Sequence, residues 1–192
     1  ELNILELEWT KIWDNLKKIK SWSYPYSLGL LYSAVTHYLG YKPNEEEYIV
    51  MGMSAFGEPI YDYEYLLYEN NHRGIKSLEG KPEDIAASIQ KLYEDELLKL
   101  VKMCTKKNLI IMGGCALNCV ANSKIKDKNI WIMPSPGDAG SSLGASALKQ
   151  KKIKWEHPYL GYDISRYINP KEVVDDLLEN KIVGVANGKA EF

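Results

Sequence analysis

The apolar positions of the chain divide it into a few helical and extended segments. The longest helical pattern covers residues 82–104, where apolar side chains recur every three or four positions and Pro82 stands in the first turn. A second helix is expected from Ser27, a suitable N-cap, to about Leu39, before Gly40. Because this second segment is apolar nearly all round, we expect it to be buried between layers.

Two short apolar runs, residues 109–112 and 130–133, are typical of buried strands. The first ends at Gly113 and Gly114 and is followed by a helical pattern over residues 115–124. The second ends at a Pro-Ser-Pro-Gly-Asp loop, after which residues 141–148 read as a helix. The sequence therefore predicts two strand-loop-helix units in tandem.

The remaining segments give weaker patterns. Residues 1–20 have apolar positions near a helical period and predict an amphipathic helix, whose Trp9 and Trp13 belong to a core or to a partner surface. Residues 48–59 are strand-like but interrupted by glycines, which indicates a loop. Residues 61–68 fit an edge strand or a turn of helix, residues 170–180 a helix, and residues 182–186 a buried strand. His37 is expected to be a structural histidine within its apolar helix.

Composition narrows the class of protein. With 192 residues and 45% hydrophobic content, the chain can form one substantial core and part of another. Its formal charge of −2 gives no basic footprint for nucleic acid, and its apolar runs are too short to cross a bilayer. Three cysteines and the lack of a recognisable signal peptide favour a soluble protein of the reducing cytoplasm.

The candidate chemistry lies in the two loops that follow the predicted parallel strands. Such loops meet at the carboxyl edge of an open sheet, where α/β proteins usually bind ligands. Gly113 and Gly114 allow a phosphate or ribose to approach the backbone, and Asp138 stands in the neighbouring loop. An anionic ligand beside a carboxylate indicates a metal ion between them. Equally, the glycines fit a simple tight turn and Asp138 fits a helix-entry carboxylate.

The strings IMGGCALNCVANSKI and MPSPGDAGSSLGA resemble the nucleotide and metal loops of the nodulation-type O-carbamoyltransferases. Residues 27–59 and the segment HPYLGYDI, residues 157–164, resemble further parts of the same family in the same order. The resemblance implies an α/β fold, the second half of an actin-like ATPase (RNase H-like) domain, related to the Hsp70 ATPase and to tRNA threonylcarbamoyl-transfer proteins. Residues 1–164 would belong to this nucleotide-binding domain, and residues 165–192 would begin a C-terminal α/β domain.

The resemblance also implies an activity. Members of the family use ATP to activate carbamoyl phosphate as carbamoyl adenylate, and then transfer the carbamoyl group to a hydroxyl of a small molecule. A divalent metal, Fe or Mg, accompanies the nucleotide. No Ser-His-Asp or Cys-His constellation is recognisable for an acyl-enzyme, so we expect direct transfer and assign no catalytic residue.

Residue roles follow from the same resemblance. Gly113, Gly114 and Asn118 would contact the nucleotide, and Asp138 would bind the metal. Ser33 is a further candidate contact, although related tRNA threonylcarbamoyl-transfer proteins have an acidic residue at its place. Tyr26 also departs from the family, whose members commonly have histidine there.

The ends of the sequence look cut, since the family's upstream histidine-rich metal motif and downstream Gly-Pro-Arg motif are not found. We therefore expect an internal fragment that is inactive alone and whose partner is the remainder of the full-length chain. Two alternatives are kept: another enzyme of the ATPase superfamily, such as a small-molecule kinase, and a noncatalytic binding module.

Overall fold

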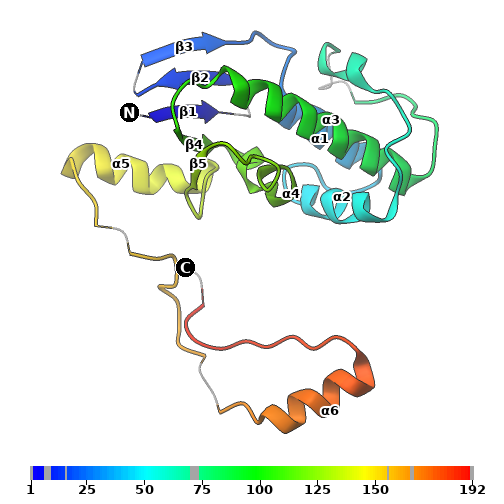
Figure 1. Cartoon of the computed structure of the whole chain (residues 1–192), viewed down its shortest axis with the longest axis vertical. Helices are drawn as coiled ribbons and strands as arrows, with labels where there is room; N and C mark the ends of the chain where they lie inside the picture. The colour runs from blue at the N-terminus through cyan, green and yellow to red at the C-terminus, as the bar shows by residue number, and fades with distance from the viewer. Residues whose placement is uncertain are drawn as a thin grey trace. The chain divides into compact units, whose positions relative to one another are not determined.

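The computed structural model describes residues 2–6, 10–15, 17–69, 74–154, 156–164 and 167–190. The chain forms two compact units, Glu1–Ala145 and Ser146–Phe192 (Figure 1). Every residue proposed above as a ligand contact lies in the first unit. The assignment of residues 1–164 and 165–192 to two domains of a longer protein stays a prediction.

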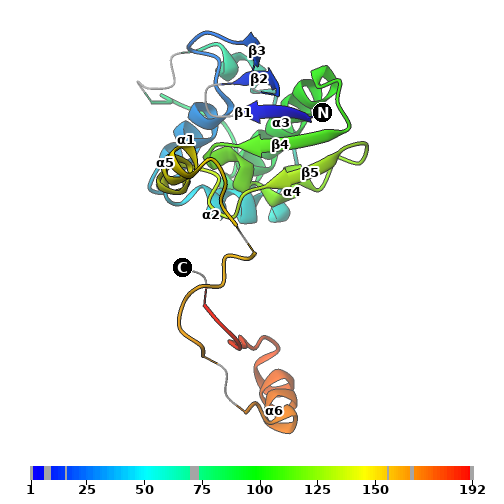
Figure 2. The ribbon, with the colours of Figure 1, turned by 90° about the vertical axis from the view of Figure 1, so that its left-hand side faces the viewer.

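The first unit is built on a mixed five-stranded sheet in the order β3-β2-β1-β4-β5 (Figures 1 and 2). Strands β1 (Leu2–Glu6), β4 (Asn108–Met112) and β5 (Asn129–Ile132) are parallel neighbours. Strands β2 (Lys11–Asp14) and β3 (Lys17–Ser21) extend the sheet in antiparallel fashion from β1. The predicted α/β class and the two predicted strands of the tandem units are confirmed.

The amphipathic helix expected over residues 1–20 is wrong, because this segment forms β1, β2 and β3. Leu5 and Ile12 are fully buried, and Thr10 and Asn15 have positive φ values, 28° and 52°, at the two turns. The apolar positions of residues 1–20 fit both a helical and a strand period. The strand conformation is selected by β4, which pairs with β1 residue by residue. Trp13 is half-buried, whereas Trp9 lies outside the described residues.

The two helices predicted over residues 27–39 and 82–104 are formed. Helix α1 (Leu28–Tyr38) begins at the N-cap Ser27, whose Oγ accepts from the Leu30 N–H at 3.2 Å. Helix α3 (Pro82–Met103) starts at Pro82 and buries an apolar stripe that includes Tyr93 and Leu97. Together with the sheet these helices enclose the hydrophobic core. His37 lies on the exposed side of α1 and is not the packed histidine we expected.

Residues 48–59 were expected to form a loop, but most of them are helical. Helix α2 (Glu47–Met53) continues into the short 3₁₀ helix η1 (Ser54–Phe56) and packs against α3. Gly52 is accommodated within the helix, while Gly57 is required by a close backbone approach. A Cβ at Gly57 would lie 2.0 Å from the carbonyl oxygen of Glu83. Gly57 therefore reflects packing and not an irregular loop.

The other helices follow the sequence patterns more closely. Residues 64–67 form the 3₁₀ helix η2 (Glu64–Leu67), which is the turn of helix among the two alternatives. Helices α5 (Ser141–Gln150) and α6 (Pro170–Asn180) are formed as expected. Within the described ranges, no helix has the length and apolar character needed to cross a bilayer.

The buried strand expected at residues 182–186 is not formed. A strand needs a neighbour with which to exchange backbone hydrogen bonds. In the described part of the second unit, the pairing found is an isolated antiparallel bridge between Asp163 and Lys189. Ile182 is 84% exposed.

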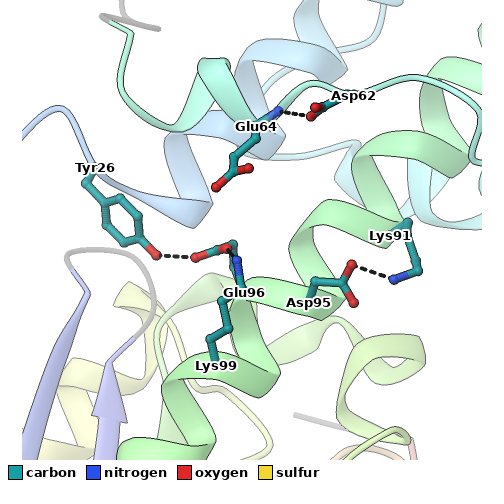
Figure 3. Close-up of polar contacts among 7 residues, drawn as sticks. All are labelled: Tyr26, Asp62, Glu64, Lys91, Asp95, Glu96 and Lys99. Carbon is teal, nitrogen blue, oxygen red and sulfur yellow. Dashed lines mark hydrogen bonds and ion pairs between the residues drawn. The ribbon is translucent and has the colours of Figure 1, made fainter.

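A buried carboxylate on α3 joins this helix to the segment before α1 (Figure 3). Glu96, 6% exposed, accepts hydrogen bonds from the Tyr26 hydroxyl at 2.8 Å and from Lys99 Nζ at 2.5 Å. The carboxylate of Glu64, on η2, lies near these side chains and adds negative charge around Lys99. Burial, followed by the hydrogen bond and the charge of Glu96, raises the pKa of Tyr26 well above its usual range. Tyr26 is therefore a neutral hydrogen-bond donor at neutral pH.

We expect Tyr26→Phe to lower the free energy of unfolding by about 2 kcal/mol, since it removes a hydrogen bond to a buried charge. Tyr162→Phe, at a residue that is 92% exposed, is the matched control and should change little. Urea unfolding of the full-length protein, followed by tryptophan fluorescence, measures both. Equal stability of the two variants would show that the Tyr26 contact with Glu96 contributes nothing.

The same contact predicts a dependence on pH. The raised pKa of Tyr26 means that the folded state holds this proton more tightly than the unfolded chain, where tyrosine titrates near 10.0. Its contribution is therefore complete below about pH 10 and is lost as the pH rises further. In Tyr26→Phe the decline of stability above pH 10 should be shallower by up to about 1.4 kcal/mol per pH unit. Unfolding curves between pH 8 and 11 test this, and unchanged slopes would contradict it.

Candidate functional site

A cavity of about 460 Å³ lies in the first unit, where the loops after β4 and β5 meet the helical layer. This volume is in the range of pockets that hold small molecules and cofactors. Its position beyond the carboxyl ends of two parallel strands is the one predicted from the strand-loop-helix units. It is lined by α1 and α3 residues Gly29, Leu30, Tyr32, Ser33 and Tyr93, by Asn44, Glu45, Glu47, Tyr48 and Met51, and by the loop residues Gly114, Cys115, Leu117, Asn118, Gly137 and Asp138.

The two glycines after β4 have different tasks. Gly113 has a φ of +89°, which only glycine adopts readily, and its N–H donates to the Pro136 carbonyl at 3.0 Å. This hydrogen bond ties the loop after β4 to the loop after β5. Gly114 lines the cavity, and no atom of the described residues lies within 4 Å of a Cβ built on it. Gly113 thus shapes the turn, and Gly114 leaves room at the cavity wall because it has no side chain.

The continuous helix expected over residues 115–124 is interrupted. A 3₁₀ helix, η4 (Gly114–Leu117), is followed by the four-residue helix α4 (Cys119–Asn122), with Asn118 between them. Asn118 has ψ near 84° and caps α4, because its Oδ1 accepts from the Ala121 N–H at 3.0 Å. A helix of four residues has only a weak dipole to offer an anionic ligand.

Asn118 is 9% exposed and pairs with Gln90, a buried residue of α3. The Asn118 Nδ2 donates to Gln90 Oε1 at 2.9 Å, and Gln90 Nε2 donates to Asn118 Oδ1 at 3.2 Å. Gln90 also accepts from the Tyr32 hydroxyl at 2.8 Å and donates to Glu94 Oε1 at 3.0 Å. A connected polar network of Tyr32, Gln90, Glu94 and Asn118 therefore supports one wall of the cavity, where Tyr32 and Asn118 line it.

Ser33 faces the cavity from α1 and donates its hydroxyl proton to Glu47 Oε1 at 2.6 Å. The same carboxylate oxygen accepts from the Asn44 N–H at 2.6 Å, at the start of α2. The cavity has an acidic group beside Ser33, although Ser33 is itself neutral.

Asp138 begins the 3₁₀ helix η5 (Asp138–Gly140) and is an exposed residue of the cavity lining. The loop is held tightly, because a Cβ at Gly140 would lie 2.1 Å from the Ser135 carbonyl oxygen. Among the described residues, no three His, Cys, Asp or Glu side chains come together as a metal site. Asp138 therefore fits one ligand of a metal ion, and the described residues do not fit a complete protein-built site.

The charge and hydrogen-bonding character of the cavity limit what it can hold. Of the described residues that line it, the charged ones are Glu45, Glu47 and Asp138. Burial, followed by nearby acidic groups, raises the pKa of Tyr32, and burial raises that of Tyr93, whose hydroxyl donates to the Cys115 carbonyl at 2.9 Å. Both phenols are therefore neutral at physiological pH. The lining suits ligand hydroxyls and apolar rings, whereas phosphate groups require a counter-cation there.

The structure brings Ser33, Gly114, Asn118 and Asp138 to one cavity, with Gly113 directly behind the wall. Their ligand roles stay predictions. The sequence interpretation missed Glu47 and Gln90. An acidic run at residues 45–47 was a signal for the first, since carboxylates are favoured at helix N-termini. A glutamine three residues before Tyr93, on the apolar side of α3, was the signal for the second.

Comparison with known proteins gives the family. The family model for the carbamoyltransferase N-terminus matches residues 7–74 and 62–147, which is more than half of the chain. The chain therefore belongs to the nodulation-type carbamoyltransferase family.

Individual relatives agree with this assignment. An uncharacterised protein of Synechocystis sp. is 37% identical over 166 residues, covering 64% of this chain and 27% of the relative. Nodulation protein NolNO of Sinorhizobium fredii is 29% identical and nodulation protein U of the same organism 31% identical, covering 69% and 58% of this chain and 24% and 25% of those proteins. The chain spans less than half the length of the relatives it matches.

The glycines allow the site to be separated from the fold. Gly114→Ala should leave stability unchanged and reduce occupancy of the cavity, since its new methyl group meets the ligand and not the protein. Gly144→Ala in α5 is the matched control, because its Cβ is equally unobstructed by described residues and it is not among the cavity residues. Gly140→Ala should instead destabilise the protein by about 1–3 kcal/mol through overpacking.

Melting temperatures of the three variants with and without ATP and Mg²⁺ make this comparison. The expected result is that ATP raises the melting temperature of Gly144→Ala but not of Gly114→Ala. Equal stabilisation of both variants by ATP would contradict the placement of the ligand at Gly114.

Proposed function

We propose that this chain forms part of the nucleotide site of an ATP-dependent O-carbamoyltransferase. The observation that carries the proposal is the single cavity in which Ser33, Gly114, Asn118 and Asp138 meet, in a chain that belongs to the carbamoyltransferase family. The mixed sheet with parallel strands β1, β4 and β5 supports assignment to the second half of an actin-like ATPase domain.

In the proposed reaction, water cleaves carbamoyl phosphate to carbamate and inorganic phosphate, and carbamate attacks the α-phosphorus of ATP to form carbamoyl adenylate with release of pyrophosphate. The carbamoyl group is then transferred to a small-molecule hydroxyl. In the transfer step the hydroxyl oxygen bonds to the carbamoyl carbon, the bond to AMP breaks, and the hydroxyl proton is released. A mixed carbamic–phosphoric anhydride is a strong electrophile, so positioning carries much of the catalysis. The chain's own contribution is to hold the nucleotide part of such molecules.

The roles of the residues follow from their chemistry. Gly114 leaves room for close approach to the backbone, and the Glu47 carboxylate, held by Ser33 and the Asn44 N–H, accepts hydrogen bonds from ribose hydroxyls. Apolar surface for a base comes from two lining residues, Leu117, which is 62% exposed, and Met51. Apolar walls with a few fixed polar groups are the usual composition of a small-molecule site.

Asp138 is proposed as a ligand of the divalent cation, Mg²⁺ or Fe²⁺, that accompanies the nucleotide. Such a cation neutralises phosphate charge in a cavity that otherwise presents three carboxylates. A complete site also needs ligands beyond the described residues, from the nucleotide phosphates or from other parts of the protein. Our proposal for this chain is therefore one carboxylate at the mouth of the loop after β5.

The test compares Asp138→Asn with Asp127→Asn in the full-length protein by calorimetric titration of ATP, with and without Mg²⁺ or Fe²⁺. Asp127 is an exposed carboxylate in the connection that precedes β5, whereas Asp138 follows the other end of this strand. Asp138→Asn should weaken metal-dependent ATP binding at least about tenfold, which corresponds to about 1.4 kcal/mol, and Asp127→Asn should not. Unchanged binding in Asp138→Asn would make Asp138 structural.

Product analysis distinguishes the candidate activities. With carbamoyl phosphate, ATP and a hydroxyl acceptor, the proposal predicts AMP, pyrophosphate, inorganic phosphate and a carbamate ester. Formation of ADP and a phosphate ester would instead show a small-molecule kinase. Nucleotide binding without either product, in the full-length protein and with a panel of acceptors, would favour a noncatalytic module.

A further inference from the structure

Gln90 lies at the centre of the polar network beside the cavity, and all of its hydrogen-bonding partners are defined. It is 4% exposed, and its amide forms a reciprocal pair with the amide of Asn118. Gln90 itself is not among the residues that line the cavity, whereas Asn118 is. Any effect of Gln90 on a ligand is therefore exerted through the cavity residues that it contacts, which are Asn118 and Tyr32.

The orientation of both amides is fixed at the two ends of the network. At one end, the Ala121 N–H can only donate, so the atom of Asn118 that it meets at 3.0 Å must be the oxygen. At the other end, the Glu94 carboxylate can only accept, so the atom of Gln90 that it meets at 3.0 Å must be the nitrogen. The two constraints agree, and they leave Gln90 Oε1 to accept from Asn118 and from the Tyr32 hydroxyl.

These contacts determine what Asn118 can offer a ligand. Its Oδ1 accepts from Ala121 and from Gln90, which uses both lone pairs. Its Nδ2 gives one hydrogen to Gln90 and retains one. A free Asn side chain has both donor and acceptor atoms for a ligand, but in this network Asn118 presents a single N–H donor.

We infer that Gln90 is a positioning residue, which holds Asn118 so that the cavity offers an N–H donor to an acceptor atom of the nucleotide. This inference rests on the proposed nucleotide site. The ligand atom is a ring nitrogen, or a ribose or phosphate oxygen, and a ligand that presents an N–H at this point is disfavoured. An unpaired buried polar group is costly, so selection against the wrong ligand is strong.

A double-mutant cycle tests the inference, with Gln90→Met, Asn118→Ala and the double variant in the full-length protein. Methionine keeps the length of the side chain and removes both the carbonyl oxygen and the NH₂ group of the amide. Each single variant should weaken ATP binding about tenfold in calorimetry, and Gln90→Met should have little further effect once Asn118 is alanine. In steady-state assays the KM for ATP should rise with little change in kcat. Gln150→Met, the same change at an exposed position of α5, should leave all values unchanged.

Additive effects of the two substitutions would overturn the inference, because they would mean that Gln90 does not act through Asn118. Should the methionine variant not fold, Gln90→Glu keeps the shape and removes the N–H donors, and the same coupling with Asn118→Ala is expected. Failure of the wild-type protein to bind ATP would contradict the proposed function itself. Binding of ATP by wild type with no loss in Gln90→Met would contradict the positioning role alone.

Discussion

Parallel pairing of β4 with β5 is the constraint on which the cavity depends. Four residue pairs, from Asn108 with Asn129 to Ile111 with Ile132, hold the two strands in register. The loops that follow both strands therefore leave the sheet at the same edge. The loops that follow are then joined by the hydrogen bond from the Gly113 N–H to the Pro136 carbonyl. Segments that are more than twenty residues apart in sequence thereby form one continuous wall, with Gly114 and Asp138 on it.

The helical layer completes the cavity and gives it its chemical character. Helix α3 supplies buried tyrosine and amide groups, α1 supplies Ser33, and the start of α2 supplies Glu47. The buried tyrosine and glutamine side chains of this layer are hydrogen-bonded, as the low dielectric of the interior requires. The cost of burying these groups is offset by hydrogen bonds to one another, and the result is a rigid surface with few exposed donors. Rigidity of this kind favours selective binding, because little ordering remains to be done when a ligand enters.

The sequence predicted the parts of this arrangement that depend on local patterns. Residues 82–104 and 27–39 have long apolar patterns of helical period. Their starts are marked by Pro82 in the first turn and by the N-cap Ser27, and both helices were placed nearly correctly. The first twenty residues were misread because their apolar spacing fits two periods, and β4, about a hundred residues away, decides between them. The strand expected at residues 182–186 failed for the same reason in reverse, since no described neighbour pairs with it. Local pattern gives the preference of a segment, and pairing across the fold gives its structure.

The site was predicted to a similar extent. The glycines and Asp138 follow apolar runs directly, so their meeting at the sheet edge could be expected from chain order. Glu47 and Gln90 could not be found in this way, because each acts on a residue of another element: Glu47 accepts from Ser33 on α1, and Gln90 pairs with Asn118 after β4. Side-chain networks that cross between elements are a property of the packed structure and leave only faint traces in a single sequence.

Hydrogen–deuterium exchange of the full-length protein, with and without ATP and Mg²⁺, tests the central claim that the nucleotide occupies this cavity. The account predicts slower exchange on binding at residues 113–118, at residues 137–140 and at the start of α2, because these segments line the cavity. Exchange in the connection before β5, residues 126–128, should not change. Saturating ATP that protects other parts of the protein and leaves the two cavity loops unprotected would contradict the account.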